Sequence, residues 1–260
     1  MSGSKRWPGS RWHDLLPDAI SILDSGGHTE WTFGGGTALA LWLDHRISYD
    51  IDIFTRGALK SLTRSFCAET RRVLGKTGSS QFSGYYLKIE LDGGEIDFLT
   101  SHNLIDNPTQ KVSLTTILTH TDPIGSAPNY GGRMIDVEVP CEILTRKIML
   151  RGENFKYRDA FDLAAGFSYD PNVLNAALDI FNDQPDAIDQ LLKRLELMKS
   201  AYVSNAPGII TPTFGFEHLL GHEGIDICLK GVGDLRKRMT PPPVLCVNSF
   251  YSSNFSGNIL

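Results

Sequence analysis

The chain of 260 residues contains only four cysteines, at positions 67, 141, 228 and 246. No two of them form a Cys-x-x-Cys pair, so the sequence does not favour a zinc ribbon or a thioredoxin-type redox pair. Four cysteines in a chain of this length are also too few for a disulfide scaffold. We therefore expect a protein of a reducing compartment, the cytoplasm.

The sequence also lacks long apolar runs and an excess of positive charge. No stretch approaches the length of about 18 apolar residues that indicates a membrane-spanning helix, and the N-terminal residues lack the apolar segment of a secretory signal. The formal net charge is −5, from 25 basic and 30 acidic residues. This balance argues against a protein that coats nucleic acid by bulk charge, although it is compatible with a local basic site.

What the sequence does contain is an ordinary share of apolar residues, 41%, which is enough for a globular core. Residues 2–10 have the composition of a loose leader. Periodicity predicts helices over 15–23, 37–44, 58–75, 141–167 and 173–203. It predicts strands over 30–33, 49–54, 85–91, 95–99 and 136–139, with Asp-Gly-Gly at 92–94 as a hairpin turn.

The most informative stretch is FGGGTALALWLDHRISYDIDIF, residues 33–54. A glycine turn between a strand and a helix frees backbone N–H groups for a phosphate, and Thr37 is placed to cap the helix or to donate to that phosphate. Asp50 and Asp52 follow on a strand and share one of its faces, opposite Ile51 and Ile53. Two adjacent carboxylates favour a cation such as Mg²⁺.

A phosphate cradle beside a divalent-metal clamp is what nucleotidyl transfer requires. Each motif alone also has a plainer interpretation, as an ordinary turn and an ordinary strand edge. A third carboxylate is expected from residues 95–99, if that strand lies beside 49–54. Asp97 is the better candidate and Glu95 the alternative, while a solvated hairpin face would need neither.

The same stretch resembles the AbiEii/AbiGii toxin family of the DNA polymerase β-like nucleotidyltransferase superfamily, and the matching positions are Gly35, Gly36, Thr37, Arg46, Ser48, Asp50 and Asp52. The resemblance implies an α+β fold, a mixed sheet nucleotidyltransferase core with flanking helices and a C-terminal helical lobe. It also implies that Asp50, Asp52 and Asp97 hold Mg²⁺ or Mn²⁺. The glycine turn, Thr37, Arg46 and Ser48 would bind the nucleotide of an NTP.

A second motif of that family matches within residues 142–164, at Lys147, Arg151, Arg158, Asp159 and Asp162. On one continuous helix, positions 147, 151, 158 and 162 would share a face, a pattern that an interruption at 152–154 would spoil. Lys147 and Arg151, with Arg158, would neutralise phosphate charge. Asp159 or Asp162 would act as a base or hold a cation. Ordinary ion pairs along a solvated helix are the alternative.

Three further features have weaker interpretations. Residues 56–76 carry six basic residues and one acid, which suits either an RNA backbone or, as we favour, a solvated face of a helix. His45 is expected to pack at a helix end. His218 and His222 have the spacing of a metal pair but lack an evident third ligand, so we expect them to be structural.

The sequence thus predicts a catalytic lobe at residues 1–140, a helical lobe at 141–205 that contributes to the active-site cleft, and a poorly defined segment and tail at 206–260. The predicted activity is Mg²⁺-dependent transfer of NMP from an NTP to an RNA, such as tRNA, or to a protein. The resemblance implies the toxin of a toxin–antitoxin or phage-defence system, with an antitoxin as a possible partner. The lack of long apolar runs predicts no membrane association. A DxD glycosyltransferase and a non-catalytic nucleotide-binding relative are the alternatives.

Overall fold

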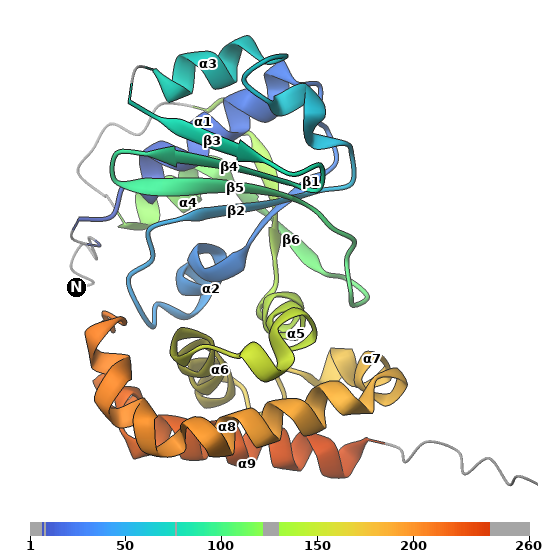
Figure 1. The fold of residues 1–260 in the computed structure, drawn as a ribbon, viewed down its shortest axis with the longest axis vertical. Coiled ribbons are helices and arrows are strands. Elements are labelled where there is room, and N and C mark those ends of the chain that lie inside the picture. Colours follow the sequence, from blue (N-terminus) through green and yellow to red (C-terminus); the bar gives the residue numbers. More distant parts are fainter. Residues whose placement is uncertain (1–6, 8, 76, 122–129, 240–260) are drawn as a thin grey trace, which may run out of the picture.

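The computed structural model describes residues 7, 9–75, 77–121 and 130–239. A mixed sheet with its own helices forms one half of the molecule, and a group of helices forms the other half (Figure 1). The predicted α+β class with a C-terminal group of helices is confirmed.

Seven strands form one sheet in the order β3-β4-β5-β2-β1-β7-β6. Parallel pairing joins β2 to β5 and β1 to β7, whereas the other neighbours are antiparallel. The predicted hairpin is confirmed as β4 and β5. The strand bounds are β1 Trp31–Gly34, β2 Ile51–Thr55, β3 Ser79–Phe82, β4 Tyr86–Leu91, β5 Gly94–Thr100, β6 Thr109–Ser113 and β7 Met134–Glu138.

The central strands are apolar on one face and polar on the other. Ile51 and Ile53 of β2 are fully buried together with Phe33, Ile96 and Phe98 of the neighbouring strands. Helix α1 (Trp12–Ser25) packs against β2 and β5, α3 (Ala68–Leu74) against β4, and α4 (Leu114–Thr121) against β6. Since side chains alternate along a strand, the residues between these apolar positions emerge on the opposite face.

The helical half follows β7 directly. It consists of α5 (Pro140–Arg151), α6 (Tyr157–Tyr169), α7 (Leu178–Asp183), α8 (Pro185–Asn205) and α9 (His222–Arg238). Helix α9 packs against α6 and α8, and α5 packs against α6 (Figure 1). Helix α2 (Gly35–Leu43) contacts β1 and β2 as well as α5 and α6, so it joins the two halves.

The segment after residue 205 has more structure than its sequence indicated. Residues 206–239 contain two short 3₁₀ helices, Ala206–Gly208 and Glu217–Leu220, before α9. The segment also hydrogen-bonds to the loop after α2, from Ile47 N–H to the Thr211 carbonyl (2.9 Å) and from Thr213 N–H to the His45 carbonyl (3.1 Å). The predicted tail from 240 onward lies outside the described residues.

Three long helices that we predicted are broken. Residues 58–75 form a 3₁₀ turn, Leu59–Leu62, and the short α3, because Cys67 between them has an extended backbone (φ −105°, ψ 119°). Residues 141–167 divide at Gly152, whose φ of +34° ends α5. The region 173–203 likewise divides between α7 and α8, where Pro185 begins a new helix.

Other elements escaped prediction. The short strands β3 and β6 and the helix α4 carry weak periodicity. Trp7 and Ser10 are buried instead of belonging to a loose leader, and the Ser10 hydroxyl donates to the Ser48 carbonyl (2.5 Å).

Candidate active site

The polar face of the sheet presents one row of residues across four adjacent strands. Asp97 of β5 lies opposite Asp52 of β2, and Asp52 lies opposite Gly34 of β1. The register of β1 with β7 then places Glu138 beside Gly34. Asp50, two positions before Asp52, belongs to the same face.

The glycine turn is shaped around Asp52. Gly35 has a φ of +66°, which favours glycine, and a Cβ there would overlap the Asp52 carboxylate. The Asp52 carboxylate accepts a hydrogen bond from the backbone N–H of Gly36. No side chain caps the N-terminus of α2, so the turn offers backbone donors at the positive end of the helix dipole.

Thr37 does not make the predicted helix cap, because its fully buried hydroxyl contacts Ser48 Oγ (2.8 Å) and donates to the Asp50 carbonyl. Ser48 is itself buried. These two residues tie α2 to the start of β2 and do not line the cavity described below. Their contribution is to hold Asp50 and the turn in place.

The three acids are crowded with negative charge. Burial raises the pKa of Asp52, and the nearby charge of Asp50 raises it further, against the opposing effect of Lys147. Burial and the charge of Asp52 raise the pKa of Asp97 to about 6, while Tyr86 Oη donates to its carboxylate (3.0 Å). Burial, then Glu95, raises the pKa of Asp50. A cation would relieve this repulsion.

The choice between Asp97 and Glu95 can be judged from their partners. Asp97 lies directly beside Asp52, whereas the Glu95 carboxylate pairs with Lys88 Nζ (2.5 Å). The Asp50 carboxylate faces the start of β5, since it accepts a hydrogen bond from the backbone N–H of Glu95. Asp97 is therefore the acid that meets Asp52.

Within the described ranges, no three His, Cys, Asp or Glu side chains converge as a preformed metal cluster. Mg²⁺ is commonly bound by one or two carboxylates together with waters and substrate phosphates. The pair of Asp52 and Asp97 fits that requirement, and Asp50 lies next to Asp52 on the same face of the sheet.

A cavity of about 110 Å³ lies in front of this row. Its sheet side is formed by the glycine turn and by Asp52 and Glu138 of the row, whereas Asp50 and Asp97 are not part of its lining. Its other wall comes from α5. The lining residues are Gly35, Gly36, Asp52, Phe54, Leu99, Glu138, Ile143, Arg146, Lys147, Leu150 and Arg151. Carboxylates, backbone donors and three cations thus converge on one small space, which suits a phosphate chain with a metal ion.

The cations of α5 are held by acids of α6. Lys147 Nζ pairs with Asp159 and with Asp162, both at 2.9 Å. Arg151 also pairs with Asp159, whose other oxygen accepts the Lys156 N–H (3.1 Å) in a capping box at the start of α6. The break at Gly152 therefore does not disperse the motif, because the two helices bring its residues together.

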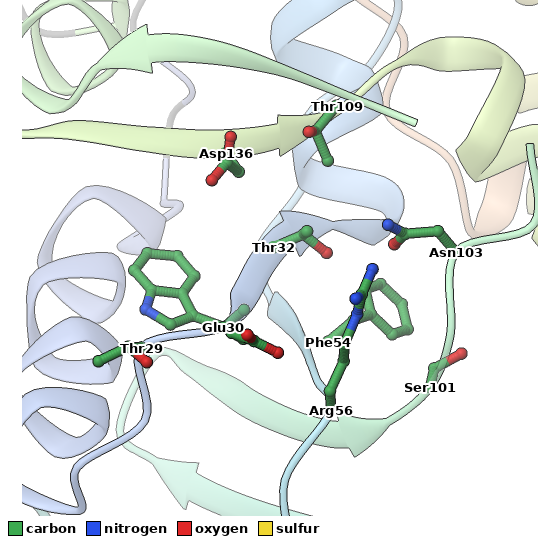
Figure 2. Close-up of a pocket in the computed structure, with 10 residues that line it drawn as sticks. Thr29, Glu30, Thr32, Phe54, Arg56, Ser101, Asn103, Thr109 and Asp136 are labelled. Atoms are coloured by element: carbon green, nitrogen blue, oxygen red, sulfur yellow. The ribbon is translucent and has the colours of Figure 1, made fainter. Parts of the chain in front are cut away.

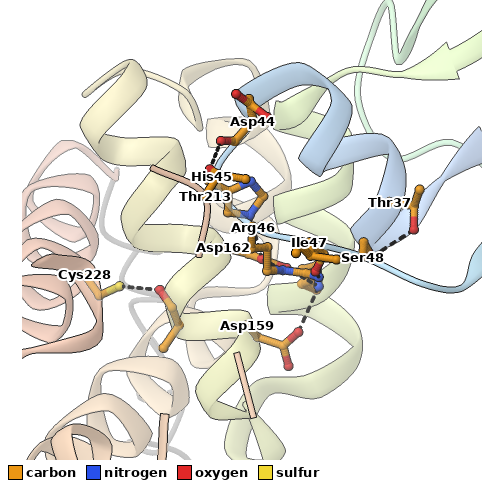
Figure 3. A network of polar contacts seen from close by, with 12 residues as sticks. Thr37, Asp44, His45, Arg46, Ile47, Ser48, Asp159, Asp162, Thr213 and Cys228 are labelled. Atoms are coloured by element: carbon orange, nitrogen blue, oxygen red, sulfur yellow. Dashed lines mark hydrogen bonds and ion pairs between the residues drawn. The ribbon is translucent and has the colours of Figure 1, made fainter. Parts of the chain in front are cut away.

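Asp162 also receives the loop after α2. Arg46 forms a bidentate pair with it, Nε to Oδ1 at 2.6 Å and Nη2 to Oδ2 at 3.1 Å, and His45 Nε2 is 2.8 Å from Oδ1. Figure 3 shows this network, in which Asp162 of α6 faces His45 and Arg46 of the loop. His45 stacks on Phe161, consistent with its predicted packing at a helix end.

The structure argues against the base role predicted for Asp159 or Asp162. Both are fully buried. Burial alone would raise their pKa values, yet Arg46 and Lys147 hold the pKa of Asp162 well below its usual range, and Lys147 with Arg151 lowers the pKa of Asp159. Carboxylates of this kind accept protons poorly, so they act here on the neighbouring cations.

Two further predicted nucleotide ligands lie away from the cavity. Arg46 is buried on Asp162, and its Nη2 lies close against Gly36, so it supports the turn from behind. Arg158 is exposed and does not line the cavity, although its charge lowers the pKa of Asp50. His218 and His222 are exposed and belong to no metal cluster of the described residues.

A second cavity, of about 290 Å³, adjoins the first at Phe54 on the same face of the sheet. Its lining includes Thr32, Arg56, Ser101 and Asn103, and Figure 2 shows these side chains around the opening. Sequence reasoning missed this cavity, together with the buried Glu138 and Arg146. The alternation of residues 136–139 places Glu138 on the same face of the strand as Asp136, and this alternation is the sequence signal for Glu138.

The basic segment 56–76 is divided in the structure. Arg72 pairs with Glu69 and Asp18, and Lys60 Nζ lies 5.1 Å from the Phe66 ring centroid. Since the segment is not one helix, its cations do not form one stripe. None of the helices in the described part of the chain is long and apolar enough to cross a membrane.

Comparison with known proteins agrees with this geometry. No curated protein matches the chain. The model of one family, described as the nucleotidyl transferase AbiEii toxin of type IV toxin–antitoxin systems, matches residues 19–208. That span includes the glycine turn, all three acids of the sheet and the α5–α6 network. The chain therefore belongs to the AbiEii nucleotidyl transferase toxin family and is a nucleotidyltransferase.

Proposed function

We propose that this nucleotidyltransferase moves the NMP of a Mg²⁺-bound NTP onto a hydroxyl group of an RNA, such as a tRNA, or of a protein. The observation that carries the proposal is the Asp52–Asp97 pair beside the glycine turn, with Lys147 and Arg151 across the same cavity. Mn²⁺ would serve the same donor set. As a toxin of its family, the enzyme would have an antitoxin as its partner.

The residues divide the reaction among them. Asp52 and Asp97, with Asp50, would hold Mg²⁺, which when bound supplies charge neutralisation at the reacting phosphate. The Gly35 and Gly36 backbone would cradle the triphosphate, and Lys147 and Arg151 would neutralise the charge that develops on the departing pyrophosphate. The acceptor hydroxyl oxygen would then bond to the α-phosphorus as the bond to pyrophosphate breaks, and the hydroxyl proton would pass to water.

Asp159 and Asp162 would act indirectly, through the cations with which they pair. By pairing with Lys147 and Arg151, they fix two of the three cations that line the cavity. We therefore assign them as positioning residues, and Arg46, Thr37 and Ser48 as supports of the glycine turn. In this assignment the catalytic lobe 1–140 supplies the acids, the helical lobe 141–205 supplies the cations, and the segment from 206 holds the loop after α2.

A cytoplasmic location is part of the proposal. The three cysteines in the described ranges, Cys67, Cys141 and Cys228, are free and buried, as expected for a reducing compartment. We also keep the RNA acceptor as a proposal, because the basic residues of segment 56–76 that lack acidic partners, such as Arg56 beside the second cavity, can contact a phosphate backbone.

The test incubates the purified protein with Mg²⁺ and each of the four α-³²P-labelled NTPs, together with a tRNA pool or cell extract. The wild type is expected to label an acceptor, and Asp52→Asn is expected to label none. Asp189→Asn is the matched control and should retain activity, because Asp189 is a partly exposed acid of α8 that does not line the cavity. Labelling that is equal in the wild type and Asp52→Asn would refute the assignment.

A further inference from the structure

Glu138 stands at the end of β7 with one carboxylate oxygen that has no partner. Its side chain is fully buried, yet it lines the 110 Å³ cavity. Oε1 accepts hydrogen bonds from Thr32 Oγ1 (3.1 Å) and from Arg146 Nη2 (2.9 Å). Oε2 is buried without any hydrogen-bond partner among the described residues.

The surroundings of Glu138 do not balance its charge. Arg146 serves two carboxylates, since its Nη2 also pairs with Glu142 (2.6 Å). Glu142 in addition accepts the backbone N–H groups of Leu104 and Ile105. Two buried acids thus share one guanidinium, and the oxygen left over is the one on Glu138. An unpaired buried oxygen is costly unless a ligand supplies its donor.

The backbone gives Glu138 access to whatever occupies the cavity. Gly34 lies between Asp52 and Glu138 in the row, and a Cβ at Gly34 would overlap the Glu138 carboxyl group. Two strand spacings separate Asp52 from Glu138, about 10 Å. A ligand with its phosphates at Asp52 and the glycine turn, and with its remaining part over Gly34, would bring that part to Glu138.

For an NTP, that remaining part is the nucleoside. We propose that Glu138 is a specificity-determining residue whose Oε2 accepts a hydrogen bond from an O–H or N–H donor of the nucleoside half of the NTP. This inference rests on the proposed function. Ribose hydroxyls and base N–H groups supply the same donor chemistry, so the choice between them is made by the experiment.

Glu138→Gln is the decisive variant, because glutamine keeps the shape and the oxygen toward Arg146 while turning the second acceptor into a donor. Glu142→Gln is the matched control. It removes a buried charge from the same Arg146 but lies outside the cavity lining. Titration calorimetry with Mg²⁺ measures the affinity of each variant for the four NTPs, their 2′-deoxy and 3′-deoxy forms, and inorganic triphosphate.

The wild type is expected to bind its preferred NTP about 10- to 100-fold more tightly than the form that lacks the donor, as a site with a buried hydrogen-bonding group does. Glu138→Gln should lose that ratio while binding inorganic triphosphate normally, and Glu142→Gln should keep the ratio. A ratio lost for a deoxy form identifies the ribose, and one lost between bases identifies the base.

Equal losses for every nucleotide and for triphosphate, in both variants, would overturn the inference and leave Glu138 as a support for Arg146. Unchanged ratios in Glu138→Gln would overturn it as well. If the wild type bound no NTP at all, the proposed function would fail first, and the inference with it.

Discussion

Replacing Asp162 by asparagine is expected to destabilise the whole protein. The Asp162 carboxylate contacts His45, forms a bidentate pair with Arg46 and pairs with Lys147. Asp162 is fully buried, so water cannot replace these partners. Asparagine keeps one acceptor oxygen, but its amide group would turn donors toward cations. Arg46 would then be buried without its ion-pair partner, and Lys147 would keep only Asp159.

Breaking a buried ion pair on one side costs about 3–5 kcal/mol, a large part of the roughly 5–15 kcal/mol by which domains are stable. For a protein of this size, that corresponds to a fall of about 6–20 °C in Tm. The effect also depends on pH. Because Arg46 and Lys147 hold the folded-state pKa of Asp162 well below 3.8 against the opposing effect of burial, its contribution is complete above that value and is lost as pH falls below it.

Urea unfolding followed by tryptophan fluorescence at pH 7 and at lower pH measures this difference. The control is Asp189→Asn, which breaks a pair of nearly the same geometry, Arg236 Nε to Oδ1 at 2.8 Å and Nη2 to Oδ2 at 3.2 Å, on the surface. Its midpoint should stay near that of the wild type. Equal midpoints for Asp162→Asn and Asp189→Asn would refute the reasoning, as would a difference that persists unchanged in acid.

Three further outcomes are expected. Asp52→Asn should abolish transfer yet leave the Tm unchanged or higher, since burial and Asp50 already disfavour its charge; a large fall in Tm would contradict this. Gly35→Ala should lower both Tm and NTP affinity, because φ is +66° and a Cβ would overlap Asp52; full activity in the variant would disprove that shape. Burial raises the pKa of Glu138 from 4.5 to about 7, so wild-type stability should fall by about 3 kcal/mol as pH rises through that window, and Glu138→Gln should lack that slope in chemical denaturation.

The sequence was most informative where local chemistry determines structure. Three glycines followed by helix formers predicted the turn and α2, and the alternation of 49–54 placed Asp50 and Asp52 opposite Ile51 and Ile53. The turn at Asp92-Gly93 predicted the hairpin whose second strand carries Asp97, because a two-residue turn with glycine determines which residues pair. These predictions needed only neighbours in the chain.

The arrangement of the second motif depended on contacts far apart in sequence. Spacing along one helix predicted that Arg158 would join Lys147, Arg151 and Asp162. Gly152 ends α5, and the antiparallel return as α6 turns Asp159 inward and leaves Arg158 exposed. Likewise, the partner of Arg46 is 116 positions away, and no local pattern reveals that a family-typical arginine supports the turn from behind.

The loop after α2 also has a consequence for the order of synthesis. Its hydrogen-bond partners are Asp162, which lies 117 positions after His45, and Thr213, which lies 169 positions after Asp44. A ribosome releases Asp50, Asp52 and Asp97 long before it releases these partners, and Lys147 obtains both of its carboxylates, Asp159 and Asp162, only when α6 has emerged. The growing chain therefore carries Asp50, Asp52 and Asp97 while the α5 wall of the cavity is incomplete, and the site is assembled late in translation.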